Sequence, residues 1–128
     1  MIIRKDQMVA LGAEQHRAYV RRMSRYLAGA AADSIVGMDP DAISERIEKA
    51  VRRAAQFGFR SERNTSIFVE LAFCHGDEFE LSPAFAPVLG LLRHPAGPPD
   101  AKADILWRHH QALRKAENAA PATTGSAG

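Results

Sequence analysis

The chain has a single cysteine, Cys74, among 128 residues. One thiol excludes an intrachain disulfide framework and a cysteine-rich zinc site, and it fits a reducing compartment. No stretch approaches the roughly 18 consecutive apolar residues of a membrane-spanning helix. The opening MIIRKDQ is charged from its fourth residue on, so it lacks the apolar core of about 7–15 residues that a signal peptide needs. We therefore expect a cytoplasmic protein without a membrane segment.

Excess charge of one sign is also small. The chain carries 17 Lys and Arg against 15 Asp and Glu, a net charge of +2. Residues 1–60 hold eleven basic and seven acidic side chains, and residues 61–128 hold six and eight. Attraction to phosphates supplies much of the affinity for nucleic acid, so this balance argues against a nucleic-acid partner.

Strand signals are nearly absent, since no segment alternates apolar and polar residues over a useful length. Helical spacing of apolar residues, with caps and glycine stops, predicts an all-α fold instead: a single compact bundle of about five helices. Asp39-Pro40 and Ser61 start two of these helices, and Gly58 and Gly76 end them. The predicted helices span 4–28, 40–57, 62–75, 84–93 and 100–117.

The end of the chain differs in composition from the rest. Its last residues, AAPATTGSAG, are small and low in complexity, so they bury too little apolar area to offset the entropy of ordering. We expect one helical domain over 1–118 and a disordered tail over 119–128. The apolar stripes predict a core that includes Ile47, Val51, Phe57, Phe68, Leu71 and Leu106.

Reactive residue types do not form a familiar catalytic or metal-binding pattern. There is no phosphate-binding GxxxxGK or GxGxxG, no HExxH and no GxSxG. His109 and His110 point about 100° apart on a helix, and His75 and Asp77 lack a ligand spacing. Cys74 lies beside His75, but adjacent helical residues do not face each other, so we interpret it as a buried structural thiol. We expect no enzyme activity, no metal and no cofactor.

Nucleic-acid binding has one local argument. The helices over 40–57 and 62–75 are joined tightly, like a helix-turn-helix, and the second begins with side chains that reach phosphates and base edges. Those side chains are Arg60, Arg63, Asn64, Thr65 and Ser66. Glu62 and Glu70 on the same helix, and the small net charge, oppose this interpretation.

The best candidate for a partner-binding surface is a basic edge on the first helix. Arg17, Arg21 and Arg25 recur every four residues, and Arg22, Tyr19 and Tyr26 accompany them. Arginine and tyrosine are enriched in the energetically important parts of protein interfaces, although a solvated helix face is the alternative. The second candidate is the acidic step Asp77, Glu78, Phe79 and Glu80.

The whole pattern resembles a group of small helical proteins encoded beside spike and effector genes of bacterial type VI secretion systems. The likeness covers roughly residues 2–115: an opening IIRKDQMVAL, a midsection AAQFGFRSERNTSIFVELAF that leads into GDEF, and a late helix with a tryptophan. The matching positions are Gly58, Ser61, Glu62, Arg63, Phe79 and Trp107.

This resemblance implies an accessory role in secretion rather than a chemical activity. Such a protein binds an effector or a spike protein, as an adaptor or loading chaperone, or acts as an immunity protein that neutralises a cognate toxin. A small DNA-binding regulator is the third alternative. The residue types alone do not separate these roles.

Overall fold

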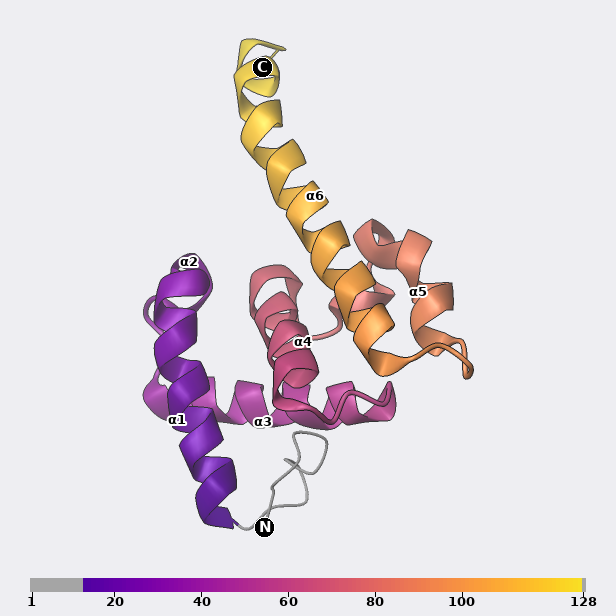
Figure 1. The fold of residues 1–128 in the computed structure, drawn as a ribbon. Helices are drawn as coiled ribbons and strands as arrows, with labels where there is room; N and C mark the ends of the chain where they lie inside the picture. The colour runs from indigo at the N-terminus through magenta and orange to yellow at the C-terminus, as the bar shows by residue number, and fades with distance from the viewer. Residues whose placement is uncertain (1–12, 128) are drawn as a thin grey trace.

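The computed structural model describes residues 13–127, and within them it contains six α-helices, two short 3-10 turns and no strand. The all-α prediction is therefore confirmed (Figure 1). No helix among the described residues is long and apolar enough to cross a membrane. The helices are α1 (Ala13–Ala30), α2 (Ala32–Ile35), α3 (Pro40–Gln56), α4 (Glu62–His75), α5 (Ala86–Arg93) and α6 (Pro99–Ala127).

Helices α3 and α4 begin where their capping residues predicted. The Asp39 carboxylate accepts a hydrogen bond from the backbone N–H of Asp41 at 3.1 Å, and the Ser61 hydroxyl accepts one from Asn64 at 3.1 Å. Each bond satisfies an N–H that a helix start leaves without an intrahelical partner. After α3, Gly58 has φ 86°, a left-handed conformation that glycine adopts without a Cβ clash.

The bounds of α1 differ from the prediction of 4–28. Residues 4–12 lie outside the described part of the chain, and α1 continues through Gly29 to Ala30. The four-residue α2 follows at once, in the stretch between the predicted helices over 4–28 and 40–57. Alanine has the highest helix propensity of all residues, so the run of alanines after Gly29 sustains helical turns despite the glycine.

Helix α6 is longer than the predicted 100–117. It extends to Ala127, and its far end projects beyond the other helices (Figure 1). The predicted disordered tail over 119–128 contains several alanines, which again favour helix. The division of the chain near residue 118 stays a prediction.

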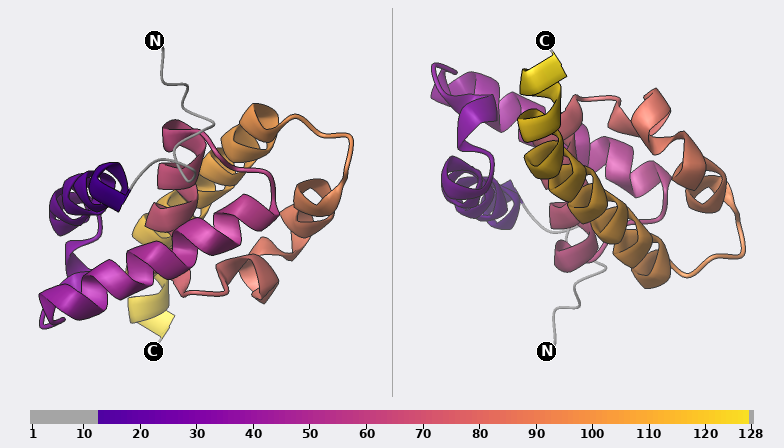
Figure 2. Two further views of the ribbon diagram at one scale, coloured as in Figure 1. Left: turned by 90° about the horizontal axis from the view of Figure 1, so that it is seen from below. Right: turned by 90° about the horizontal axis from the view of Figure 1, so that it is seen from above.

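Helix α4 lies at the centre of the structure. It packs against α1, α3 and α6, while α1 and α5 lie on opposite sides of the molecule (Figure 2). Of the predicted core residues, five are buried and Phe57 is half-buried, with its ring centroid 5.8 Å from that of Phe68. Between α5 and the end of α4, the 3-10 turns η2 (Phe79–Leu81) and η3 (Pro83–Phe85) bury Phe79 and Phe85.

Candidate functional site

A row of polar side chains on α4 faces α1. Glu62, Ser66 and Glu70 recur every four residues and therefore share one face of the helix. Each contacts one side chain of α1: Arg22 donates to Glu62 Oε2 at 3.0 Å, the Tyr19 hydroxyl lies 3.0 Å from Ser66 Oγ, and Tyr26 donates to Glu70 Oε1 at 2.6 Å. These contacts hold α1 against α4.

The start of α4 is tied to α6 as well. Asn64 donates through Nδ2 to Asp100 at 2.7 Å, and Arg63 forms an ion pair with Asp104. Arg63 also donates to the side-chain oxygen of Asn64 at 2.8 Å. The segment that carries the secretion resemblance thus has a structural explanation, because its Ser, Glu and Arg cap α4 and join it to α1 and α6.

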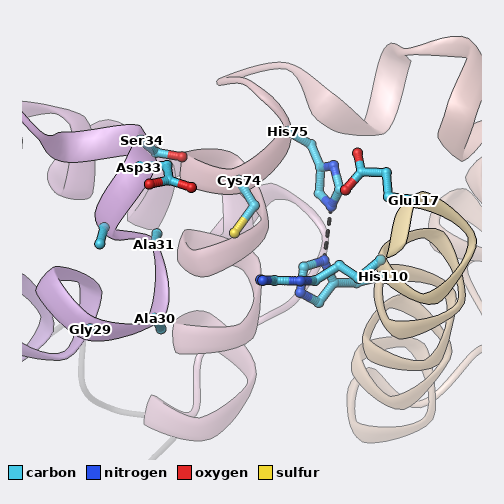
Figure 3. A pocket seen from close by; sticks show the side chains of 11 residues that line it. Gly29, Ala30, Ala31, Asp33, Ser34, Cys74, His75, His110 and Glu117 are labelled. Atoms are coloured by element: carbon cyan, nitrogen blue, oxygen red, sulfur yellow. Dashed lines mark hydrogen bonds between the residues drawn. The ribbon is translucent and has the colours of Figure 1, made fainter. Parts of the chain in front are cut away.

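The far end of α4 borders a hollow on one side. A pocket of about 270 Å³ lies between residues 29–34, the end of α4 and the middle of α6. Cys74 and His75 reach it from α4, and His110 and Glu117 reach it from α6 (Figure 3). Arg114 of α6 also lines the pocket. A second hollow, lined by Glu70, His110 and Trp107 among others, adjoins it.

Two histidines meet at this pocket. His75 Nε2 and His110 Nδ1 are 2.8 Å apart, so one ring donates a hydrogen bond to the other. His110 is 2% exposed. Burial, together with the neighbouring His75 and Arg114, lowers the pKa of His110 to about 4. Burial also lowers the pKa of His75. Both rings are therefore neutral near pH 7 and keep an sp² nitrogen lone pair.

Cys74 and Glu70 complete the polar lining. Burial and the carboxylate of Glu70 raise the pKa of the Cys74 thiol, with Arg114 acting in the opposite direction. The thiolate is the nucleophilic form of cysteine, so this environment does not favour Cys74 as a nucleophile. One ligand atom each from Glu70, Cys74 and His110 lies within 4.8 Å of the other two.

The structure divides the predicted basic edge of α1. Arg17, Arg21 and Arg25 are exposed, as a partner-binding surface requires. Arg22 is exposed but paired with Glu62, and Tyr26 is 49% exposed but bonded to Glu70. Tyr19 is only 2% exposed. Its inclusion in the surface was wrong, because the helical stripe that it shares with Met23 and Leu27 packs into the core.

The second predicted surface, residues 77–80, is largely used inside the protein. Asp77 accepts a hydrogen bond from Arg46 Nε at 2.8 Å and lies 3.8 Å from Lys49 Nζ. Arg53 pairs with Glu80 and lies 4.0 Å from Glu78. Phe79 and Glu80 are each 1% exposed. The prediction that these two residues lie at the surface was wrong, because the turn after α4 folds back onto the basic side chains of α3, namely Arg46, Lys49 and Arg53.

Four of the five residues of the helix-turn-helix alternative make contacts within the protein, while Arg60 is exposed. Asn64 and Thr65 are buried. The Thr65 hydroxyl donates to the carbonyl of Phe59 at 3.2 Å, Ser66 contacts Tyr19, and Arg63 pairs with Asp104. A recognition helix needs a free face for the major groove, and α4 is covered by α1, α3 and α6.

The cluster at the end of α4 did not emerge from the sequence. The four-residue spacing of Glu70 and Cys74 was a signal, since it puts both on one helix face. His110 lies 35 residues beyond His75, and only the parallel packing of α6 on α4 brings it to the site. Without the register of these two helices, no spacing rule connects the three residues.

No protein-family model, no curated protein and no solved structure matches this chain. The resemblance to accessory proteins of type VI secretion systems therefore stays a prediction.

Proposed function

We propose that the protein is a non-enzymatic accessory factor of a bacterial type VI secretion system, which binds an effector or spike protein as an adaptor or chaperone. The sequence resemblance supports the secretion context. The exposed row of Arg17, Arg21 and Arg25 supports binding to an acidic surface of that partner. This row is the single observation that carries the binding role.

The row differs from the basic side chains of α3 that form ion pairs within the protein. Among the described residues, no carboxylate lies within 4.0 Å of Arg17, Arg21 or Arg25. By contrast, Arg46 on α3 forms an ion pair with Asp77, and Arg53 forms one with Glu80, both in the turn after α4. Like charges four residues apart destabilise a helix by about 0.2–0.5 kcal/mol per pair, so the row does not serve the stability of α1.

An acidic partner would turn this repulsion into attraction. Complementary charges accelerate the encounter of two proteins and make association sensitive to salt. The opposite face of α1, with Tyr19, Met23 and Leu27, is buried against the rest of the molecule. The backbone of α1 is therefore already fixed before a partner binds, which limits the conformational entropy lost on binding.

The test is copurification with the products of the adjacent genes, followed by measurement of Kd at two salt concentrations. In the triple variant Arg17→Glu, Arg21→Glu, Arg25→Glu, we expect Kd to rise at least about tenfold, equivalent to about 1.4 kcal/mol. The parent complex should weaken with salt. A toxicity-rescue assay with the same gene products then separates an adaptor from an immunity protein.

A matched control keeps the same change in charge. The variant Arg52→Glu, Arg60→Glu, Arg108→Glu also replaces three exposed arginines and should bind like the parent. Helical circular dichroism and melting temperature confirm that both variants fold. Equal binding by the parent and the α1 variant would exclude this row as the interface, and no copurification of any adjacent product would contradict the proposed role.

A further inference from the structure

Three chemically different donors meet at the end of α4. Glu70 and Cys74 lie one helical turn apart, and His110 reaches them from α6. They offer a carboxylate oxygen, a sulfur and an imidazole nitrogen, all within 4.8 Å of one another. These are the three ligand types that zinc takes from proteins.

The separation of the donors is close to what a zinc ion requires. Tetrahedral zinc with bonds of about 2.0–2.3 Å holds its donors about 3.3–3.8 Å apart. Each pair, at most 4.8 Å apart, therefore needs to approach by at most about 1.5 Å, which is within reach of side-chain rotation. Glu70 is 5% exposed and His110 is 2% exposed, so the surrounding helices already hold both side chains in place.

Partners that orient the ligands are also present. Protein ligands of zinc are held by hydrogen bonds from a second layer of residues. Tyr26 donates to Oε1 of Glu70 at 2.6 Å, which leaves Oε2 for a metal. If His110 donates to His75 through Nδ1, over the 2.8 Å that separates the two nitrogens, its Nε2 keeps the lone pair that binds a metal.

We propose that Glu70, Cys74 and His110 form a zinc site, with a water molecule as the fourth ligand. This site goes beyond the proposed partner-binding role and does not depend on it. Sulfur and imidazole ligands favour zinc over magnesium or calcium, which prefer oxygen. A carboxylate and a thiolate together balance the two positive charges of the ion.

Access and charge around the site are compatible with an ion. The pocket at Cys74 and the hollow at Glu70 both include His110 in their linings, so solvent reaches the cluster from two sides. Arg114 lines both spaces and is exposed. Its guanidinium opposes a cation, so binding requires this long side chain to turn outward to solvent or to Glu117.

The proposed ion would join three helices. Glu70 and Cys74 belong to α4 and His110 to α6, while Tyr26 links Glu70 to α1. Zinc would therefore close the open end of the α1–α4–α6 assembly.

The test is a cobalt titration of tag-free, reduced and EDTA-treated protein, since Co²⁺ reports thiolate coordination through a charge-transfer band. We expect a single Co²⁺ per chain, displaced by Zn²⁺, and a melting temperature that rises with Zn²⁺. Cys74→Ser should abolish the band. Glu70→Gln and His110→Gln should weaken binding at least about tenfold, as the loss even of second-layer partners does.

Matched controls replace neighbours of the same type. His109 adjoins His110 but contacts the carbonyl of Ala84 at 2.6 Å, and Glu62 lies in the same row of α4 as Glu70. His109→Gln and Glu62→Gln should bind Co²⁺ like the parent. The proposal fails if the parent shows no thiolate band in excess Co²⁺. It also fails if Glu70→Gln binds Co²⁺ with the affinity of the parent. Because glutamine has nearly the shape of glutamate, this variant keeps the test valid even if His110→Gln misfolds.

Discussion

The two ends of α4 are both polar, but they use their polar groups differently. At the first turn, Ser61, Asn64 and Thr65 are all engaged in hydrogen bonds to the cap, to α6 or to the preceding loop. At the last turns, Glu70 and Cys74 border hollows between the helices. The first turn of α4 is joined to its neighbours by hydrogen bonds, whereas its last turns border solvent-accessible hollows.

This difference separates residues that build the fold from residues that can take a ligand. A buried polar group stabilises a protein when its hydrogen bonds are satisfied, and it specifies how elements pack. The first turn of α4 meets that condition with partners from two other helices. Among the described residues, Glu70 has one oxygen held by Tyr26 and the other available for a further ligand.

The largest expected loss of stability comes from the core between the two ends of α4. Leu71 is fully buried, so Leu71→Ala should reduce the free energy of unfolding by about 2–5 kcal/mol through lost transfer energy and a residual cavity. Urea denaturation measures this loss. The control Leu91→Ala removes a side chain that is 51% exposed and should cost much less. Equal costs would show that α4 is not the central helix.

A substitution at each end tests the comparison directly. Asn64→Ala should cost about 1–3 kcal/mol, because Arg63 and Asp100 lose a partner at a buried position. Cys74→Ala, in a half-buried side chain at the hollow, should cost about 1 kcal/mol or less in metal-free protein. Urea denaturation in EDTA gives both values. If Cys74→Ala costs as much as Asn64→Ala, the two ends do not differ as described.

The two tyrosines of the chain report on the seam between α1 and α4. Burial raises the pKa of Tyr19 to about 12; the Ser66 hydrogen bond opposes this shift, and Glu62 adds to it. Burial and the bond to Glu70 raise the pKa of Tyr26 to about 12. Since both folded pKa values exceed the ordinary value of about 10, their contribution to stability is present below pH 10 and is lost between about pH 10 and 12.

Absorbance of tyrosinate measures this effect. At about pH 10.5 the native protein should show little tyrosinate, whereas urea-unfolded protein should be mostly ionised. Tyr19→Phe and Tyr26→Phe each leave one tyrosine, so each variant reports a single contact. Native ionisation near pH 10 in the Tyr26→Phe variant would contradict the burial of Tyr19.

Local signals predicted the parts of this fold that depend on local physics. Asp39-Pro40 and Ser61 marked the starts of α3 and α4, because capping is a contact within four residues. The apolar stripes likewise identified Ile47 and Leu71 as core residues. The predicted end of the first helix at residue 28 was wrong, because the alanines that follow Gly29 favour helix.

The candidate sites depended on contacts between distant segments, and there the sequence was a weaker guide. Arginines at four-residue spacing identified an exposed edge, but the same rule could not show that Tyr19 turns inward to Ser66. The acidic residues Asp77 and Glu80 looked like a surface because their basic partners, Arg46 and Arg53, belong to an earlier helix. Pairing them requires knowing that the chain reverses onto α3.

The ties at the first turn of α4 have a consequence for how the chain is made. Glu62 meets Arg22, which a ribosome has released 40 residues earlier, but Asn64 must wait 36 residues for Asp100 and Arg63 must wait 41 for Asp104. Contacts between such distant residues slow folding, because the intervening loop must close first. During synthesis, α4 therefore leaves the ribosome before the residues of α6 that bind Arg63 and Asn64 have been made. Helices α4 and α6 reach their final arrangement only after residues 100–104 have left the ribosome.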